Sequence, residues 1–224
     1  MRYFTHIVIL IVIGRGVVSS LLGAEPDPAA TNSTSLPVGT LASPAAGIWQ
    51  GEAGEGFKSS VQTFSFAAGA TAGFQAFGGQ QDHDLALVSL SYGHMVGPIM
   101  GEDHWYRGNW EIRGELFGGQ QFSSSSDWIV GLTPHLRYDL ATGTRWIPYV
   151  DGGAGVTATG IGPPDLSGIF EFNLQANAGV HWFIRDDLAL TLQAGYLHVS
   201  CAGIHYPNQG LNCTAGMIGL TWFF

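Results

Sequence analysis

The chain has 224 residues, enough for one substantial domain, and it is rich in apolar residues but poor in charge. Hydrophobic residues make up 46% of it and charged residues only 11%, whereas a soluble domain usually has about 25% charged residues. The formal net charge of −9 argues against nucleic acid as a partner, because no basic surface is available to neutralise phosphates. So few charges indicate that part of the surface does not face water.

The first 24 residues are typical of a secretory signal peptide. A basic residue precedes an apolar run at residues 7–13, and Leu-Gly-Ala at residues 22–24 fits a small-residue cleavage site. Arg15 interrupts the apolar stretch, so the cleavage point stays open, and a buried N-terminal strand is the alternative. Residues 25–57 are rich in Pro, Ala, Ser, Thr and Gly without periodicity, so we expect a flexible segment there.

From residue 58 to residue 224, apolar and polar residues alternate with a period of two, which predicts strands rather than helices. The clearest case is FEFNLQANAGVHWF at residues 170–183, where one face is aromatic and aliphatic and the other is mostly polar. Each predicted strand is long enough to cross a bilayer, which takes about 9–11 residues. We expect eight strands, close to residues 61–77, 83–93, 105–117, 127–139, 145–159, 169–183, 186–200 and 212–224.

Mostly short connections between these strands predict an up-and-down antiparallel barrel. In a soluble barrel the polar faces would meet water, whereas in a membrane barrel the apolar faces meet lipid and the polar faces line the interior. The third strand favours the membrane arrangement, because Arg107, Glu111, Arg113 and Glu115 alternate along one face and can pair within a narrow interior. A solvated sheet face with paired charges is the alternative. The expected fold is therefore all-β, an eight-stranded antiparallel up-and-down transmembrane β-barrel.

Loop lengths and aromatic residues also favour a membrane barrel. If the N-terminus is periplasmic, the short connections at 141–144 and 185–187 are periplasmic and the longer ones at 160–167 and 202–211 are extracellular. The connection at 95–103 is longer than this pattern expects. The terminal aromatic strand resembles the assembly signal of bacterial outer-membrane barrels. Aromatic residues near strand ends would form interfacial girdles: Trp105, Trp128, Trp146, Trp182, Trp222, Phe223 and Phe224.

Polar residues stand out on the apolar face of the seventh predicted strand. Two-residue alternation puts His198 and Ser200 on the same face as four apolar residues and a tyrosine: Leu188, Leu190, Leu192, Ala194 and Tyr196. Pairing with the last strand brings Asn212 alongside. Because unpaired polar groups on a lipid-facing wall are costly, we expect a catalytic relay in which Ser200 attacks, His198 takes its proton and Asn212 holds the imidazole tautomer. The alternative is that these side chains mark the headgroup interface.

The segment HVSCAGIHYPNQGLN, residues 198–212, resembles the signature of the lipid A deacylase family of outer-membrane barrels, an acyloxyacyl hydrolase-like group. That signature runs His-x-Ser-Asn-Ala-Gly, then Pro-Asn-x-Gly, with an acidic residue or Asn two positions later. The resemblance implies an eight-stranded barrel that hydrolyses an ester-linked acyl chain of lipid A by a serine hydrolase mechanism on its lipid-facing surface. The matching positions are His198, Ser200, Ala202, Gly203, Pro207, Asn208 and Gly210.

Two positions depart from the family pattern. Asn212 stands where some members have Glu, and an amide can orient a histidine but adds no negative charge to stabilise an imidazolium ion. Cys201 stands where the family places an asparagine at the oxyanion hole. The remaining candidates for oxyanion and substrate binding are the backbone N–H groups of Cys201, Ala202 and Gly203, with Asn208 nearby. The Cys201 side chain is expected to point to the opposite face of the strand.

The resemblance implies a membrane-embedded enzyme of the bacterial cell outer membrane that acts on lipid A, or lipopolysaccharide, in the outer leaflet. No metal-binding cluster stands out in the sequence, and no metal or other cofactor is expected. The sequence leaves open whether the barrel forms a homodimer and whether Cys201 and Cys213 form a disulfide. Two alternatives also stay open: a non-catalytic small outer-membrane barrel with a structural or adhesion role, and a soluble lipocalin-like carrier.

Overall fold

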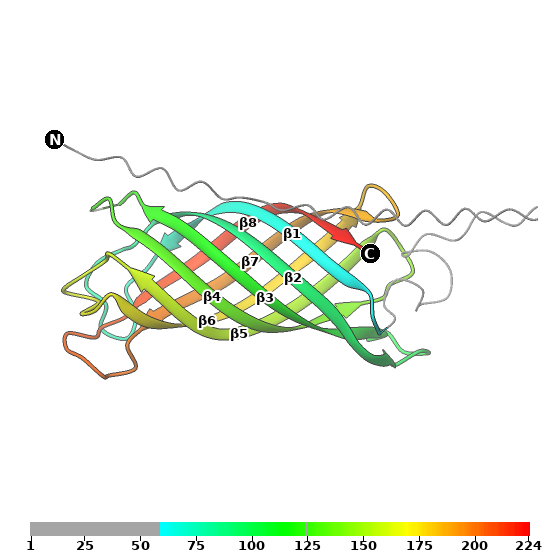
Figure 1. Cartoon of the computed structure of the whole chain (residues 1–224), viewed down its shortest axis with the longest axis horizontal. Coiled ribbons are helices and arrows are strands. Elements are labelled where there is room, and N and C mark those ends of the chain that lie inside the picture. Colours follow the sequence, from blue (N-terminus) through cyan, green and yellow to red (C-terminus); the bar gives the residue numbers. More distant parts are fainter. Residues whose placement is uncertain (1–58, 124) are drawn as a thin grey trace, which may run out of the picture. The chain divides into compact units, whose positions relative to one another are not determined.

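The computed structural model describes residues 59–123 and 125–224, which form eight antiparallel strands closed into one barrel (Figure 1). This confirms the predicted fold. No helix within these residues is long and apolar enough to cross a membrane. The predicted signal peptide and the predicted flexible segment at 25–57 lie outside the described residues. The strands are β1 (Gln62–Gly73), β2 (Leu85–Met100), β3 (Gly108–Gln121), β4 (Trp128–Leu140), β5 (Trp146–Thr159), β6 (Phe170–Phe183), β7 (Leu188–Ser200) and β8 (Leu211–Phe223).

The first strand is shorter than the sequence predicted. β1 ends at Gly73 rather than at residue 77, and the chain then leaves the sheet for a loop at residues 74–84. The backbone of His83 returns so close to Gly73 that a Cβ there would lie 2.2 Å from the His83 nitrogen. Phe77, predicted inside the strand, therefore belongs to the loop. The prediction was wrong because this close return of the chain has no periodic signature.

The second strand is longer than predicted. β2 continues to Met100, and its pairing with β3 shifts register between Val96 and Met100. Such an irregularity lets a strand absorb extra residues without ending. The long second connection expected from the sequence is instead a turn at residues 101–107, before β3 begins at Gly108.

Apolar side chains cover the outside of the barrel and polar ones fill much of the inside. On β6, Phe170 and Leu174 are exposed, whereas the intervening Glu171 and Asn173 are fully buried. The same alternation holds on β3, where Ile112 is exposed and its charged neighbours are buried. A soluble carrier has the reverse arrangement, so this exterior indicates a barrel that faces lipid.

A network of buried charges occupies the middle of the interior, centred on Asp151 of β5. Its carboxylate accepts hydrogen bonds from Arg137 at 2.8 and 3.1 Å, from Arg113 at 3.2 Å, from His135 Nδ1 at 3.1 Å and from Asn177 at 2.7 Å. The predicted pairing along the third strand is present between Arg113 and Glu115 at 3.1 Å, and the network extends from β3 to β4, β5 and β6. Buried charges of this kind are tolerated only when each has such partners.

Two apolar clusters fill the interior on either side of this network. The cluster toward the longer loops includes Leu85, Phe117, Ile129, Leu166, Val199 and Leu211. The other, toward the short turns, contains Met95, Ala141, Ile147, Phe183, Ala189 and Phe223. The girdle prediction was therefore wrong for Phe223, because alternation along β8 turns its ring inward. Trp146 and Trp182 do stack on the outside, with ring centroids 5.3 Å apart.

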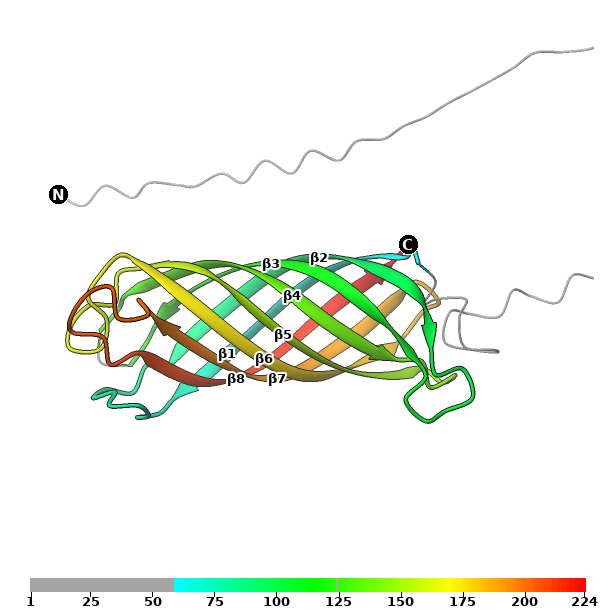
Figure 2. The same cartoon turned by 90° about the horizontal axis from the view of Figure 1, so that it is seen from below.

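The longer connections gather at one end of the barrel, at the left in Figures 1 and 2. In outer-membrane barrels the longer loops are extracellular and the short turns periplasmic. We call the four connections at this end the first to fourth loops, at residues 74–84, 122–127, 160–169 and 201–210. The short turns at the other end comprise residues 101–107, 141–145 and 184–187. β7 runs toward the loop end, so its last residue, Ser200, lies there.

Candidate active site

The candidate site lies on the outer wall of the barrel, where β7 and β8 meet the fourth loop. Alternation places Tyr196, His198 and Ser200 on the outer face of β7. The register between the two strands pairs His198 directly with Asn212 of β8. The structure thus brings together the three residues that the sequence proposed as a relay.

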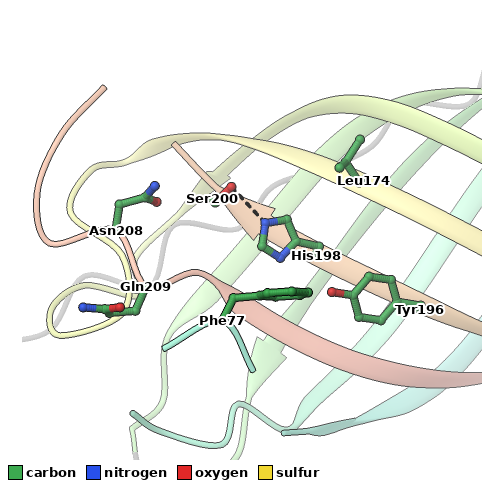
Figure 3. Close-up of a pocket in the computed structure, with 7 residues that line it drawn as sticks. All are labelled: Phe77, Leu174, Tyr196, His198, Ser200, Asn208 and Gln209. Carbon is green, nitrogen blue, oxygen red and sulfur yellow. Dashed lines mark hydrogen bonds between the residues drawn. The ribbon is translucent and has the colours of Figure 1, made fainter. Parts of the chain in front are cut away.

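Hydrogen bonds join these three side chains in series. His198 Nε2 lies 3.0 Å from Ser200 Oγ (Figure 3), and His198 Nδ1 lies 2.8 Å from Asn212 Oδ1. An amide oxygen is an acceptor only, so Nδ1 must carry the proton and donate it. Nε2 is then free to accept from the Ser200 hydroxyl, which is the tautomer that a general base requires.

Asn212 is held more firmly than the sequence implied. The Tyr196 hydroxyl donates to Asn212 Oδ1 at 2.5 Å, and Asn212 Nδ2 donates to the Ala76 carbonyl of the first loop at 3.3 Å. Asn212 is 2% exposed, whereas His198 and Ser200 are half-buried. Sequence reasoning did not assign Tyr196 to the site, although its place two residues before His198 on the same face was an available signal.

A cleft of about 480 Å³ opens beside Ser200 and His198. Phe77 and Leu174 give it apolar walls, and the ring of Phe77, itself 82% exposed, lies edge-on to the His198 ring at 6.2 Å. Sequence reasoning also missed Phe77, because it placed this residue in a strand. The residues that line the cleft, shown in Figure 3, are Phe77, Leu174, Tyr196, His198, Ser200, Asn208 and Gln209. The cleft therefore has both an apolar and a polar wall.

The residues proposed for oxyanion binding lie just after Ser200. The chain turns sharply there, since Ala202 and Gly203 have φ angles of 54° and 81°. The N–H of Cys201 donates to Asn208 Oδ1 at 3.0 Å, so this N–H is already engaged. Within the described part of the chain, the N–H groups of Ala202 and Gly203 and the Nδ2 of Asn208 have no hydrogen-bond partner. Of these residues, Asn208 lines the cleft together with Ser200, whereas Ala202 and Gly203 are exposed and do not line it.

Cys201 and Cys213 are both buried free thiols, so the structure contains no disulfide between them. As expected, the Cys201 side chain points away from the outer face and is buried. Its sulfur lies 3.3 Å from both the backbone nitrogen and the backbone oxygen of His205. Cys213 Sγ lies 3.5 Å from the carbonyl oxygen of His83. No three His, Cys, Asp or Glu side chains in the described ranges are grouped to hold a metal ion.

Asp165 of the third loop ties together the loops around the cleft. Its buried carboxylate accepts the backbone N–H groups of residues 80–81 at 2.8 and 2.9 Å and lies 2.9 Å from His83 Nε2. Its carbonyl accepts the N–H groups of residues 209–210, both at 3.0 Å. One residue thus fixes the first loop and the fourth loop, which both line the cleft, relative to each other.

Comparison with known proteins associates the chain with one family. A family model described as lipid A 3-O-deacylase (PagL) matches residues 87–221. The solved structure of the outer membrane enzyme PagL is similar, with a TM-score of 0.50 and 18% identity over 70% of this chain and 97% of that one. Neisserial surface protein A is similar too, with a TM-score of 0.52 and 15% identity over 73% of this chain and 97% of that one. No curated protein sequence matches the chain.

Proposed function

This chain belongs to the lipid A 3-O-deacylase (PagL) family of bacterial outer-membrane barrels, and on this basis we propose that it removes an ester-linked acyl chain from lipid A. The observation that carries the proposal is the series of hydrogen bonds from Ser200 through His198 to Asn212 beside an open cleft. The fold alone does not carry it, because Neisserial surface protein A, described as a surface protein, has a similar barrel.

Ser200 and His198 would perform the reaction in two halves. In the first, Ser200 Oγ attacks the ester carbonyl while His198 Nε2 takes its proton, and the protonated imidazole then donates that proton to the departing alcohol oxygen of lipid A. In the second half, His198 takes a proton from the water that attacks the acyl-serine, and returns it to Ser200 Oγ as the acyl–oxygen bond breaks. The products are a free carboxylic acid and a lipid A with one acyl chain fewer.

The remaining site residues would orient the imidazole of His198 and stabilise the negative charge of the oxyanion. Asn212 holds the imidazole in its base tautomer without adding a negative charge. The Nδ2 of Asn208 and the N–H groups of Ala202 and Gly203 are the donors that we assign to the oxyanion. Cys201 acts only indirectly in this scheme, because its N–H binds the Asn208 side chain.

The position of the cleft suits a substrate that stays in the membrane. Lipid A is amphipathic, so its acyl chains can lie along the apolar outer wall below the cleft while its sugars remain near the loops. Leu174 and Phe77 line the apolar part of the cleft, and Asn208 and Gln209 line the polar part.

The proposal is tested with purified protein folded in vesicles that contain lipid A. We expect release of one species of free fatty acid and a lipid A that mass spectrometry shows to be lighter by one ester-linked acyl group. Amide-linked chains should stay in place. Unchanged lipid A in the presence of a barrel whose folding is verified by circular dichroism would overturn the proposal and favour the non-catalytic alternative.

A further inference from the structure

The use of an amide at residue 212 creates a problem of orientation that a carboxylate would not have. A carboxylate presents an oxygen whichever way it is turned, but an amide has one acceptor end and one donor end. If the Asn212 amide were turned over, Nδ2 would face His198 Nδ1, and the imidazole proton would have to move to Nε2. Nε2 could then no longer accept the proton of Ser200.

In the structure, the Ala76 carbonyl selects the productive orientation, and the Tyr196 hydroxyl anchors the amide in that orientation. The Ala76 carbonyl lies 3.3 Å from Nδ2 and is an acceptor only, so an amide oxygen at that place would be repelled. The same carbonyl is held in place by the N–H of Gly79 at 2.9 Å. At the other end of the amide, the Tyr196 hydroxyl donates to Asn212 Oδ1 at 2.5 Å. Asn212 Oδ1 therefore accepts two hydrogen bonds, one from Tyr196 and one from His198.

We propose that Tyr196 is a positioning residue, which together with the Ala76 carbonyl holds the Asn212 amide so that His198 keeps its base tautomer. This inference rests on the proposed function of the site. Tyr196 stands on the outer wall, where water to replace a lost hydroxyl is scarce, so removal of its hydroxyl leaves Oδ1 with His198 as its partner. The first loop then contributes a backbone group to the catalytic geometry as well as a wall of the cleft.

The test measures how fast a lipophilic fluorophosphonate modifies Ser200, because this reaction reports nucleophile activation without needing lipid A. Tyr196→Phe removes only the hydroxyl and should slow the modification about tenfold, the effect of losing one hydrogen bond of about 1.4 kcal/mol. Tyr92→Phe is the matched control, since the Tyr92 hydroxyl also donates to an amide oxygen at 2.5 Å, that of Gln62 on β1. This control should react at the wild-type rate.

A double-mutant comparison separates positioning through Asn212 from any direct effect of Tyr196. In an Asn212→Ala background, Tyr196→Phe should cause no further slowing, because the residue through which it acts is gone. Nitrogen-15 spectra of His198 should show the Nδ1–H tautomer in the wild type and a share of Nε2–H in Tyr196→Phe. A wild-type rate for Tyr196→Phe, an undiminished effect in the Asn212→Ala background, or an unchanged tautomer would each overturn the inference.

Release of acyl chains from lipid A is measured in parallel and tests the proposed function separately. Modification of Ser200 that depends on Tyr196, without any release of acyl chains, would uphold the positioning role and remove lipid A as the substrate. Failure of the wild type to be modified at Ser200 would contradict the positioning role itself, because the relay would then not activate its serine.

Discussion

Replacing His198 by glutamine is expected to slow the release of the acyl chain from lipid A by at least about a thousandfold, the usual loss when a serine hydrolase loses its base. In the proposed mechanism, the Nε2 atom, 3.0 Å from Ser200 Oγ, accepts the proton in both halves of the reaction. Glutamine is of similar reach but has no titratable nitrogen. The measurement is the initial rate of fatty acid release from lipid A vesicles at saturating substrate, quantified by mass spectrometry.

His205→Gln is the control for this variant. His205 lies exposed in the fourth loop, and its contacts with Cys201 are made by its backbone, so its imidazole is dispensable in the proposed mechanism. We expect this variant to keep a rate within about threefold of the wild type, as for most surface substitutions. A His198→Gln protein as active as the His205→Gln protein would contradict the role of His198 as the base.

Replacing Asp151 by alanine is expected to lower the free energy of unfolding by about 3–5 kcal/mol, the typical effect of removing one partner of a buried ion pair. Asp151 is the shared acceptor of Arg113, Arg137 and His135 inside the barrel. Its loss would leave two guanidinium groups in the interior with fewer negative partners. The measurement is equilibrium unfolding of the barrel by urea in lipid vesicles, followed by tryptophan fluorescence.

Asp187→Ala provides a matched control in the turn at residues 184–187. Asp187 binds Arg185 at 3.0 and 3.1 Å, but the two side chains are 52% and 66% exposed. Exposed pairs of this kind contribute about 0–1 kcal/mol, so this variant should unfold close to the wild type. Equal destabilisation by the two substitutions would show that the interior network does not hold the barrel together.

The barrel could be predicted from the sequence because the alternation of apolar and polar residues within each strand is a local property of the sequence. A period of two decides which face each side chain takes, so Glu171 and Phe172 are assigned to opposite sides before any tertiary contact is known. The same rule places His198 and Ser200 on the outer wall, and hairpin pairing then brings Asn212 beside them. The convergence of these three residues therefore needed no knowledge of the loops.

The rest of the site depends on contacts between distant parts of the chain. Phe77 reaches the cleft only because β1 ends early and the first loop is bound by Asp165, more than eighty residues away in sequence. The bond from the Cys201 N–H to Asn208 depends on the course of the fourth loop, which periodicity does not describe. The Tyr196 bond to Asn212 depends on side-chain rotamers in the paired strands. None of these contacts leaves a repeating pattern in the sequence.

Lipid A recovered from outer membranes that contain equal amounts of the wild-type barrel or its Ser200→Ala variant gives the most direct test of the proposed reaction. With the wild type, mass spectrometry should show lipid A that lacks one ester-linked acyl chain. With Ser200→Ala, the lipid A should keep that chain, because no nucleophile remains beside His198. Loss of the same chain in both membranes, or in neither, would contradict the assignment of Ser200 as the nucleophile of a lipid A deacylase.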